Sequence, residues 1–269
     1  MSEPKPARGP KIIAIANQKG GVGKTTTTIN LAAALAEIGH KVLIIDLDPQ
    51  GNASTGLGIG PEARELTTYD LLLEDVPLTK LIQKTAAKNL AIIPATVDLS
   101  SADMELLSNK NRSFLLREAL HQKLMQKFGL DYILIDCPPS LNLLTINAMV
   151  AADSVLMPLQ SEFFALEGLS QLMLTIREVR QTANPDLRLE GVVLTMFDAR
   201  NNLSSMVEQD ARDNLGVLVF KTLIPRNVRV SEAPSYAQSV LDYDSTSKGA
   251  RAYRDLAREL IKNQAQAPA

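Results

Sequence analysis

The chain has 269 residues, of which 45% are hydrophobic and 22% are charged, and its formal net charge is -2. A chain of this length and composition can bury one large α/β core. Its near-neutral charge does not indicate a nucleic-acid or membrane partner, so any such surface must be a local patch. The single cysteine, Cys137, excludes an internal disulfide framework and a metal site built from several thiolates.

The two ends of the chain are expected to be loose tails. Residues 1–10 contain three prolines and no apolar run, so they predict a disordered tail rather than a signal peptide or a membrane anchor. Residues 264–269 are expected to form a second loose tail. No segment approaches the roughly 20 apolar residues of a membrane span. We therefore expect one cytoplasmic domain at residues 11–263.

Short β-branched runs alternate with helical patterns along this domain. Strands are predicted at residues 12–16, 42–47, 90–94, 132–136, 155–159, 191–196 and 219–224. Helices are predicted at residues 24–38, 113–127, 143–151, 165–182, 204–214 and 248–263. The least regular part, residues 55–88, is expected to be surface elaboration. Continuous apolar strands in this order predict an α/β fold, with a doubly wound, mostly parallel sheet between two helix layers and ligands at its carboxyl edge.

The first strand is followed by the loop Lys19-Gly-Gly-Val-Gly-Lys-Thr-Thr26. Glycines let successive N–H groups point at one anion, and the start of the next helix adds partial positive charge. This arrangement suits ATP: Lys24 would reach the β- and γ-phosphates, Thr25 would bind Mg²⁺, and Thr26 would bind the α-phosphate. The expected ATP-binding residues here are Lys19, Gly20, Gly21, Val22, Gly23, Lys24, Thr25 and Thr26.

The loop departs from the general pattern G-x-x-x-x-G-K-S/T at its start. Gln18 stands where the pattern has its first glycine, and a second lysine, Lys19, follows it. Lys19 could be a solvated loop lysine, and the glycines alone could mark an ordinary tight turn. The preceding strand, the following helix and the Gly-Lys-Thr junction between them favour a phosphate-binding loop.

Carboxylates follow two further strands. Asp46 and Asp48 lie at the end of the strand at 42–47, and Asp136 ends the apolar strand at 132–136. The second strand has the form of a Walker B strand, in which Asp136 would hold Mg²⁺ through water. An alternative for Asp46 is a strand-end carboxylate that accepts local N–H groups.

The loop at residues 19–26 resembles the deviant Walker A motif of the ParA/MinD group of P-loop ATPases. The resemblance implies that two subunits close around two ATP molecules and that Lys19 reaches the partner's nucleotide. It also implies that Asp48 positions or activates the attacking water and that Asp46 lies in the outer shell of the metal. The expected catalytic residues are therefore Lys19, Lys24 and Asp48.

Later segments are similar to the chromosomal ParA (Soj) branch of this group, so that the resemblance covers about residues 11–262. These segments are residues 48–52, 136–140, 158–168, 193–198 and 224–234. The similarity implies that the adenine pocket is lined by Met196, Asp198, Pro225 and Asn227. It places Gln160 and Glu162 near the dimer interface, although Glu162 could be a solvated charge and Phe163 and Phe164 are expected to be core residues.

The resemblance also implies a function on DNA. The ATP-bound homodimer would bind DNA nonspecifically on the nucleoid, and a ParB-like centromere-binding protein would stimulate an ATPase that is weak alone. The expected DNA-binding residues are Arg200, Arg229, Lys248 and Arg251. Arg254 and Arg258 belong to the same basic region, but Asp255 and Glu259 share their helix, so ion pairs are a serious alternative for both.

Two other functions use the same fold. A MinD-like regulator of cell division would need an amphipathic membrane helix near the C-terminus, and residues 262–269 show no bulky apolar face. A biosynthetic ligase that uses ATP to activate a carboxylate would need a small-molecule pocket that one sequence does not identify.

Overall fold

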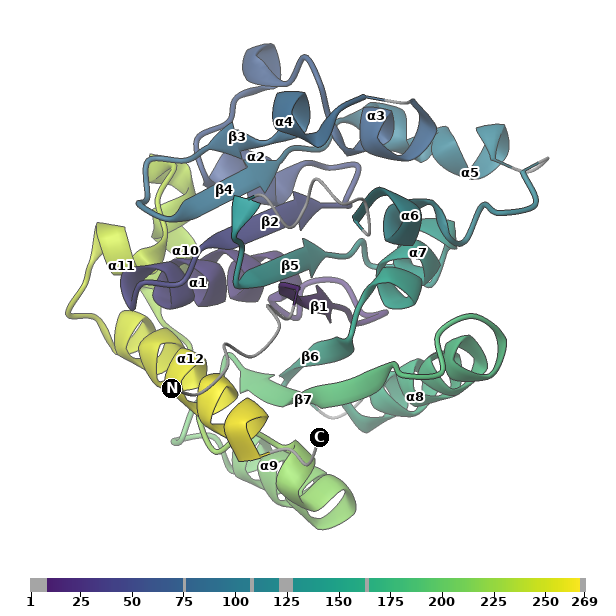
Figure 1. Ribbon diagram of the computed structural model, residues 1–269. Helices are drawn as coiled ribbons and strands as arrows, with labels where there is room; N and C mark the ends of the chain where they lie inside the picture. Colours follow the sequence, from purple (N-terminus) through teal and green to yellow (C-terminus); the bar gives the residue numbers. More distant parts are fainter. Residues whose placement is uncertain (1–8, 75, 107–108, 121–127, 163–164, 267–269) are drawn as a thin grey trace, which may run out of the picture.

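A seven-stranded sheet forms the centre of the computed structural model, which describes residues 9–74, 76–106, 109–120, 128–162 and 165–266 (Figure 1). The strands are β1 (Lys11–Ile15), β2 (Val42–Asp46), β3 (Gln83–Lys84), β4 (Leu90–Ile93), β5 (Tyr132–Asp136), β6 (Ser154–Gln160) and β7 (Arg188–Thr195). Their order is β3-β4-β2-β5-β1-β6-β7, and only β3 pairs antiparallel. This confirms the predicted fold class.

Helices cover both faces of the sheet, because alternate strand residues face two separate cores. On β1, Ile12 and Ala14 join one core, and Ile13 and Ile15 join the other. The core of Ile13 is covered by α1 (Lys24–Glu37), α2 (Asn52–Gly56), α10 (Val228–Glu232), α11 (Val240–Tyr243) and α12 (Lys248–Gln266). The core of Ile12 is covered by α3 (Thr68–Leu73), α4 (Leu78–Leu81), α5 (Ala102–Glu105), α6 (Leu115–Leu120), α7 (Leu143–Ala151), α8 (Ala165–Thr182) and α9 (Asn202–Leu215).

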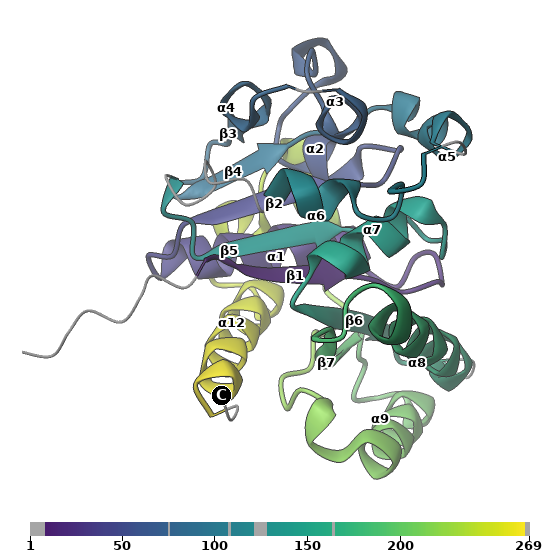
Figure 2. The same cartoon turned by 45° about the vertical axis from the view of Figure 1, so that its right-hand side comes forward.

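Helix α1, which begins at the glycine loop, is held between the sheet and α12 (Figures 1 and 2). Its residues from Thr27 to Ala36 are all buried, as expected of a helix that is apolar on nearly every side. Its last turn is fastened by Arg254 of α12, whose Nε and Nη2 donate to the Glu37 carboxylate at 2.6 and 2.8 Å. The position of α1 is therefore set by its packing against the sheet and α12, as well as by the glycine loop that precedes it.

The strand predicted at residues 219–224 is wrong. Val219 makes an isolated parallel bridge to Val192 of β7, and Ile224 N donates to Leu194 O. Between these points the backbone turns to Glu259 of α12, which accepts hydrogen bonds from the amides of residues 221 and 222 at 2.7 and 2.9 Å. The Glu259 carboxylate thus accepts hydrogen bonds from backbone amides that a continuous strand at 219–224 would donate to a neighbouring strand.

The stretch at residues 55–88 contributes a strand that the sequence did not predict. It contains α3, α4, a 3-10 turn at Pro61–Ala63 and the two-residue edge strand β3. The helix predicted at residues 113–127 is described from Leu115 to Leu120, and residues 121–127 lie outside the described part. Helix α12 continues to Gln266, and Gln264 within it bonds to Tyr132 and Glu190, so the loose tail predicted from residue 264 onward is wrong for residues 264–266. The predicted tail residues 1–8 and 267–269 also lie outside the described part.

None of the helices described is both long enough and apolar enough to cross a lipid bilayer.

Candidate active site

The glycine loop lies between the end of β1 and the start of α1, at the carboxyl edge of the sheet. Gly23 precedes α1 with φ of 87°, a left-handed conformation that strains any side chain. Gly20 and Gly21 are exposed, whereas Val22 is buried and its carbonyl accepts a hydrogen bond from Thr195 Oγ1 at 2.8 Å. The loop is therefore tied to β7 while its glycine backbone stays open at the helix N-terminus, which suits an anion.

Both lysines of the loop donate hydrogen bonds to acceptors within this chain. Lys24 is buried, and its Nζ donates to the carbonyl of Lys19 at 3.0 Å. Burial lowers the pKa of Lys24, and the nearby Asp136 carboxylate opposes that shift. Lys19 Nζ donates to Glu162 Oε2 at 3.0 Å, and Gln160 donates to the other oxygen of Glu162. Lys19 and Glu162 are thus paired with each other, not separately solvated charges.

Two aspartates lie side by side behind the loop, because β2 and β5 are adjacent and Asp46 is in register with Asp136. Both are completely buried. Asp46 accepts from Asp48 N at 3.2 Å and from Ser54 N and Oγ at 2.9 and 2.6 Å. The alternative considered for Asp46, acceptance of local N–H groups, is therefore present in the structure.

Asp136 has one oxygen that is not satisfied. Its Oδ1 accepts from Thr28 Oγ1 at 2.9 Å, whereas its Oδ2 is buried with no hydrogen-bond partner of acceptable geometry in the described structure. The Thr25 hydroxyl faces the same carboxylate and lowers its pKa. Burial, and then the charge of Asp46, outweigh these hydroxyls and raise the pKa of Asp136 to about 8.

Burial also raises the pKa of Asp46 to about 6, so the two carboxylates resist holding two negative charges without a counter-ion. A divalent cation near Asp136 Oδ2 and Thr25 would relieve this repulsion. No group of three or more His, Cys, Asp or Glu side chains in the described residues could hold a metal alone. A cation here would need water and phosphate oxygens as further ligands, as Mg²⁺ commonly does.

Asp48 lies in a tight turn just beyond β2. It is 7% exposed, its Oδ1 accepts from Gln50 N at 3.0 Å, and its carbonyl accepts from Gly51 N at 2.8 Å. Gly51 has φ of 61° and directly precedes α2. The Asp48 carboxylate is thus held at the same sheet edge as Asp46 and Asp136.

The two segments predicted to line an adenine pocket lie side by side. Phe197 pairs with Pro225 in a parallel bridge, and Arg226 N donates to Phe197 O at 3.0 Å. Met196 is half-buried with φ of 52°, and its methyl lies 4.0 Å from where a Cβ on Gly23 would be. Asp198 follows in the same segment, and Asn227 accepts from Val230 N as the cap of α10. The structure therefore places Met196 beside the glycine loop and the segment of Pro225 beside that of Met196.

The four predicted DNA-binding residues fall into two pairs. Arg200 binds Asp198 through Nε and Nη2 at 3.0 and 2.9 Å, which lowers the pKa of Asp198 to about 2. Arg229 binds Glu232 and Asp244 at 2.9 and 3.4 Å. Lys248 and Arg251, exposed at the start of α12, make no ion pair within the described part of the chain and line a hollow of about 320 Å³.

Arg254 and Arg258, for which ion pairs were the alternative to DNA binding, both form ion pairs in the structure. Arg258 binds Asp255 at 3.0 Å within α12, as the spacing indicated. Arg254 binds Glu37 of α1 instead of a residue of its own helix.

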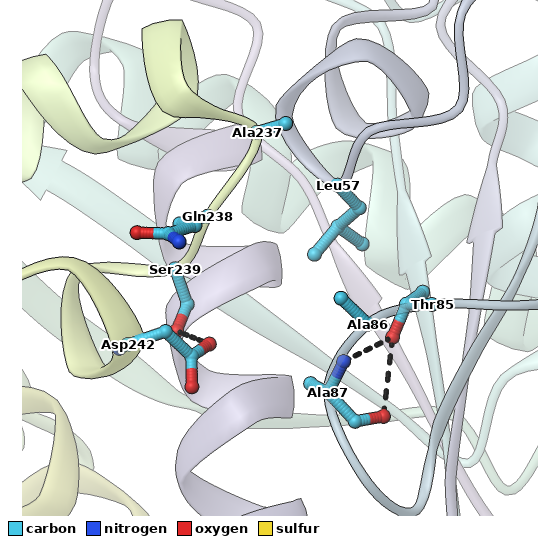
Figure 3. Close-up of a pocket in the computed structure, with 8 residues that line it drawn as sticks. All are labelled: Leu57, Thr85, Ala86, Ala87, Ala237, Gln238, Ser239 and Asp242. Atoms are coloured by element: carbon cyan, nitrogen blue, oxygen red, sulfur yellow. Dashed lines mark hydrogen bonds between the residues drawn. The ribbon is translucent and has the colours of Figure 1, made fainter.

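A second hollow, of about 210 Å³, lies between the end of α2, the β3–β4 turn and α11 (Figure 3). Its polar residues bond locally: Ser239 donates to Asp242, and Thr85 bonds to the backbone of Ala87. None of the predicted site residues lines this hollow.

The fold and the loop together define a class: the chain is a P-loop nucleotide-binding protein. Residues 10–189 match a family model described as an AAA domain. The chain is 55% identical over 254 residues to the chromosome partitioning protein ParA of Caulobacter vibrioides, covering 94% of this chain and 95% of that protein. It is 52% identical to the sporulation initiation inhibitor protein Soj of Bacillus subtilis, covering 94% and 99%. The chain belongs to the ParA/Soj family of P-loop ATPases.

A solved structure of cobyrinic acid a,c-diamide synthase from Mycobacterium smegmatis, with a bound ATP analog and magnesium, has the same fold. It is 37% identical, covers 96% of both chains and superposes with a TM-score of 0.84. Nucleotide and Mg²⁺ binding are thus properties of this fold.

Several polar residues of the site were missed by the sequence analysis. The hydroxyls of Thr28, Ser54 and Thr195 hold Asp136, Asp46 and the glycine loop. Thr28 had a signal, because it lies one helical turn beyond Lys24 on the same face. Ser54 and Thr195 had none, because their contacts depend on how distant segments pack.

Proposed function

We propose that this chain is a chromosome-partitioning ATPase of the cytoplasm. Its ATP-bound homodimer binds DNA nonspecifically on the nucleoid, and hydrolysis, stimulated by a ParB-like centromere-binding partner, releases it. The names and high identity of the relatives support the partitioning role. The observation that carries the ATPase is the buried Asp136 carboxylate, which Thr25 faces behind the glycine loop and whose Oδ2 has no hydrogen-bond partner within the described structure.

The residues fit ATP and Mg²⁺ at this place. The backbone amides of residues 20–26 and the ammonium of Lys24 would hold the phosphates, after Lys24 leaves the Lys19 carbonyl. Thr25 and, through water, Asp136 would hold Mg²⁺, which neutralises charge on the phosphates when bound. Asp46 would act in the outer shell, by fixing Asp48 N and Ser54. Met196, Asp198, Pro225 and Asn227 would surround the base.

Asp48 and Lys19 would make hydrolysis depend on dimerisation. A carboxylate can orient a water molecule or accept its proton, and Asp48 is held at the phosphate edge for that task. Lys19 would exchange Glu162 for the partner's nucleotide, adding positive charge where negative charge develops. Because this lysine comes from the other subunit, a monomer would lack it.

The dimer would then bind DNA through basic residues of both subunits, so that two weak sites act together. Lys248 and Arg251 are the residues best prepared for phosphates, since no acidic residue of the described chain pairs with them. Arg200 and Arg229 would have to exchange carboxylates for phosphates.

The two alternative functions have less support. A MinD-like membrane role would need an exposed apolar helix face, but α12 buries Tyr253, Leu256 and Leu260 against the sheet, up to its described end at Gln266. A ligase role is favoured by the similarity to the diamide synthase structure, but that identity, 37%, is lower than the 55% to ParA.

The proposal is tested by DNA co-sedimentation with ATP, with ADP and without nucleotide, with anionic liposomes in parallel. Binding to DNA with ATP alone, and no binding to liposomes, supports the partitioning function. ATP-dependent liposome binding supports the MinD-like alternative. DNA binding that does not depend on ATP contradicts the proposal that ATP controls DNA binding.

A further inference from the structure

Arg64 makes an unusually complete set of hydrogen bonds next to the Asp48 turn. It follows the 3-10 turn at Pro61–Ala63 and is half-buried. Its Nε and Nη2 donate to the carbonyl of Ile59 at 3.0 and 2.7 Å, its Nη1 donates to the carbonyl of Ala95 at 3.1 Å, and its Nη2 also donates to Thr55 Oγ1 at 2.7 Å. One guanidinium thus joins the segment after β4, helix α2 and the loop that follows α2.

The same guanidinium lies directly against the turn that carries Asp48. A Cβ added to Gly51 would lie 2.3 Å from Arg64 Nη1 and 2.8 Å from the Ala95 carbonyl. Gly51 is therefore required both for its φ of 61° and for the space that Arg64 occupies. Its amide donates to the Asp48 carbonyl at 2.8 Å, and its carbonyl accepts from Thr55 N at 2.9 Å.

The turn is consequently fixed from two sides. On the inner side, Asp46 accepts from Asp48 N and Ser54 N, and Ser54 Oγ also accepts from Ala95 N at 3.1 Å. On the outer side, Arg64 closes the same segment onto the Ala95 carbonyl. The inner contacts come from Asp46 of β2 and Ser54 of α2, whereas the outer ones come from one side chain.

We propose that Arg64 is a positioning residue for ATP hydrolysis: its guanidinium fixes the turn at residues 48–51, and with it the Asp48 carboxylate. This inference rests on the proposed role of Asp48 in hydrolysis. None of the hydrogen bonds that the described structure gives Arg64 involves Asp48 itself, so Arg64 acts through the Ala95 carbonyl and through the Thr55 hydroxyl, which in turn donates to the Gly51 carbonyl at 3.0 Å.

Lysine cannot replace arginine in this role. The guanidinium reaches two carbonyls and one hydroxyl with donors in one rigid plane, whereas an ammonium is a single point with three donors. Small errors in position at a reacting centre are costly, since a shift of about 1 Å can slow a reaction about 100-fold. The glycine loop and Lys24 make no hydrogen bond to Arg64, so ATP affinity should not depend on it.

The test compares Arg64→Lys and Arg64→Gln with Gly51→Ala, in which the added methyl displaces an intact arginine. Single-turnover hydrolysis at saturating ATP with DNA present is measured beside the Kd for ATP and the urea unfolding curve. We expect all three variants to slow hydrolysis about tenfold or more while the Kd for ATP stays at the parent value. The control is Arg180→Gln, at an exposed arginine in the last turn of α8, which should keep the parent rate.

Hydrogen exchange gives a readout that does not depend on catalysis. In Arg64→Lys the amides of Gly51 and Thr55 should exchange faster than in the parent, while those of β2 stay protected. Unchanged exchange at these amides, or an equal loss of ATP affinity and rate, overturns the positioning role. Asp48→Ala separates the two proposals: if it is inactive while Arg64→Lys keeps the parent rate, only the Arg64 proposal fails. If Asp48→Ala itself keeps the parent rate, the hydrolytic role of Asp48 fails first and that of Arg64 fails with it.

Discussion

The buried interior of the candidate active site and the exposed basic surface are built in opposite ways. Inside, Asp46 and Asp136 have no exposure, and all but one of their oxygens accept a hydrogen bond in the described structure. Outside, the Arg200 side chain is 90% exposed and its only ion pair in that structure joins it to Asp198 two residues away. The buried aspartates are held in one arrangement, as a reaction site requires. The exposed basic side chains can exchange carboxylates for phosphates, which suits nonspecific binding to DNA.

The largest effect should come from Asp48→Ala, which removes the carboxylate from the interior and leaves the surface unchanged. We expect hydrolysis to fall by about 10²-fold or more, the contribution usual for a group that accepts or orients a reacting proton. ATP-bound dimers should then accumulate on DNA. Phosphate release and DNA retention with ATP measure the two effects, with Asp98→Ala, at an exposed carboxylate, as the control. A variant that turns over as fast as the parent removes Asp48 from the mechanism.

Lys19→Ala should separate nucleotide binding from dimerisation. The loop and Lys24 remain, so some ATP binding should persist, but the dimer loses a charged contact worth about 1.5–3 kcal/mol, or at least about tenfold in its dissociation constant. Light scattering with ATP measures the dimer fraction. An unchanged fraction would show that Lys19 acts only within its own subunit, through its Glu162 pair.

The buried carboxylates should also make the stability of the protein depend on pH. Asp136 has a folded pKa of about 8, against about 4 when unfolded. In this window the folded state holds a proton that the unfolded state has lost. The contribution of Asp136 to stability without nucleotide and metal should therefore fall as pH rises to about 8, by at most about 1.4 kcal/mol per pH unit.

Asp136→Asn isolates that contribution, because an amide of the same shape does not titrate. Its urea unfolding free energy should change less between pH about 6 and about 8 than that of the parent. Parallel curves for parent and variant would mean that Asp136 is ionised in the folded protein throughout this range.

Substitutions on the basic surface should cause smaller losses of DNA affinity, which differ from residue to residue. Arg251→Ala should weaken DNA binding several-fold and lower the salt dependence by about two units, because each subunit of the dimer loses one phosphate contact. Arg229→Ala should weaken it less, because Arg229 must first leave Glu232 and Asp244. Neither variant should alter ATP-dependent dimerisation. Titrations of labelled DNA at several salt concentrations rank them, and a larger loss for Arg229 would reverse the proposed order.

The fold and the interior were largely predictable because local patterns determine them. A glycine loop between strand and helix places Lys24, and two apolar strands that end in aspartate become neighbours once the sheet is parallel. The strand expected at 219–224 was wrong because Glu259, far along the chain, takes its backbone donors. The role of Arg64 could not be predicted for the same reason, since its hydrogen-bond partners come from three separate segments.

The basic surface was the least predictable part. The sequence placed Arg254 and Arg258 in one helix with Asp255 and Glu259, but only the structure shows that Arg254 fastens α1 through Glu37. Whether a surface charge is paired depends on neighbours that come from elsewhere in the fold.

In the proposed cycle, ATP closes two subunits into the form that binds DNA. Sedimentation of Asp48→Ala with a short labelled duplex tests it directly, because this variant should hold the ATP state. We predict DNA-bound particles that carry two protein copies with ATP, and none with ADP. Binding as a monomer, or equally strong binding with ADP, would contradict the account.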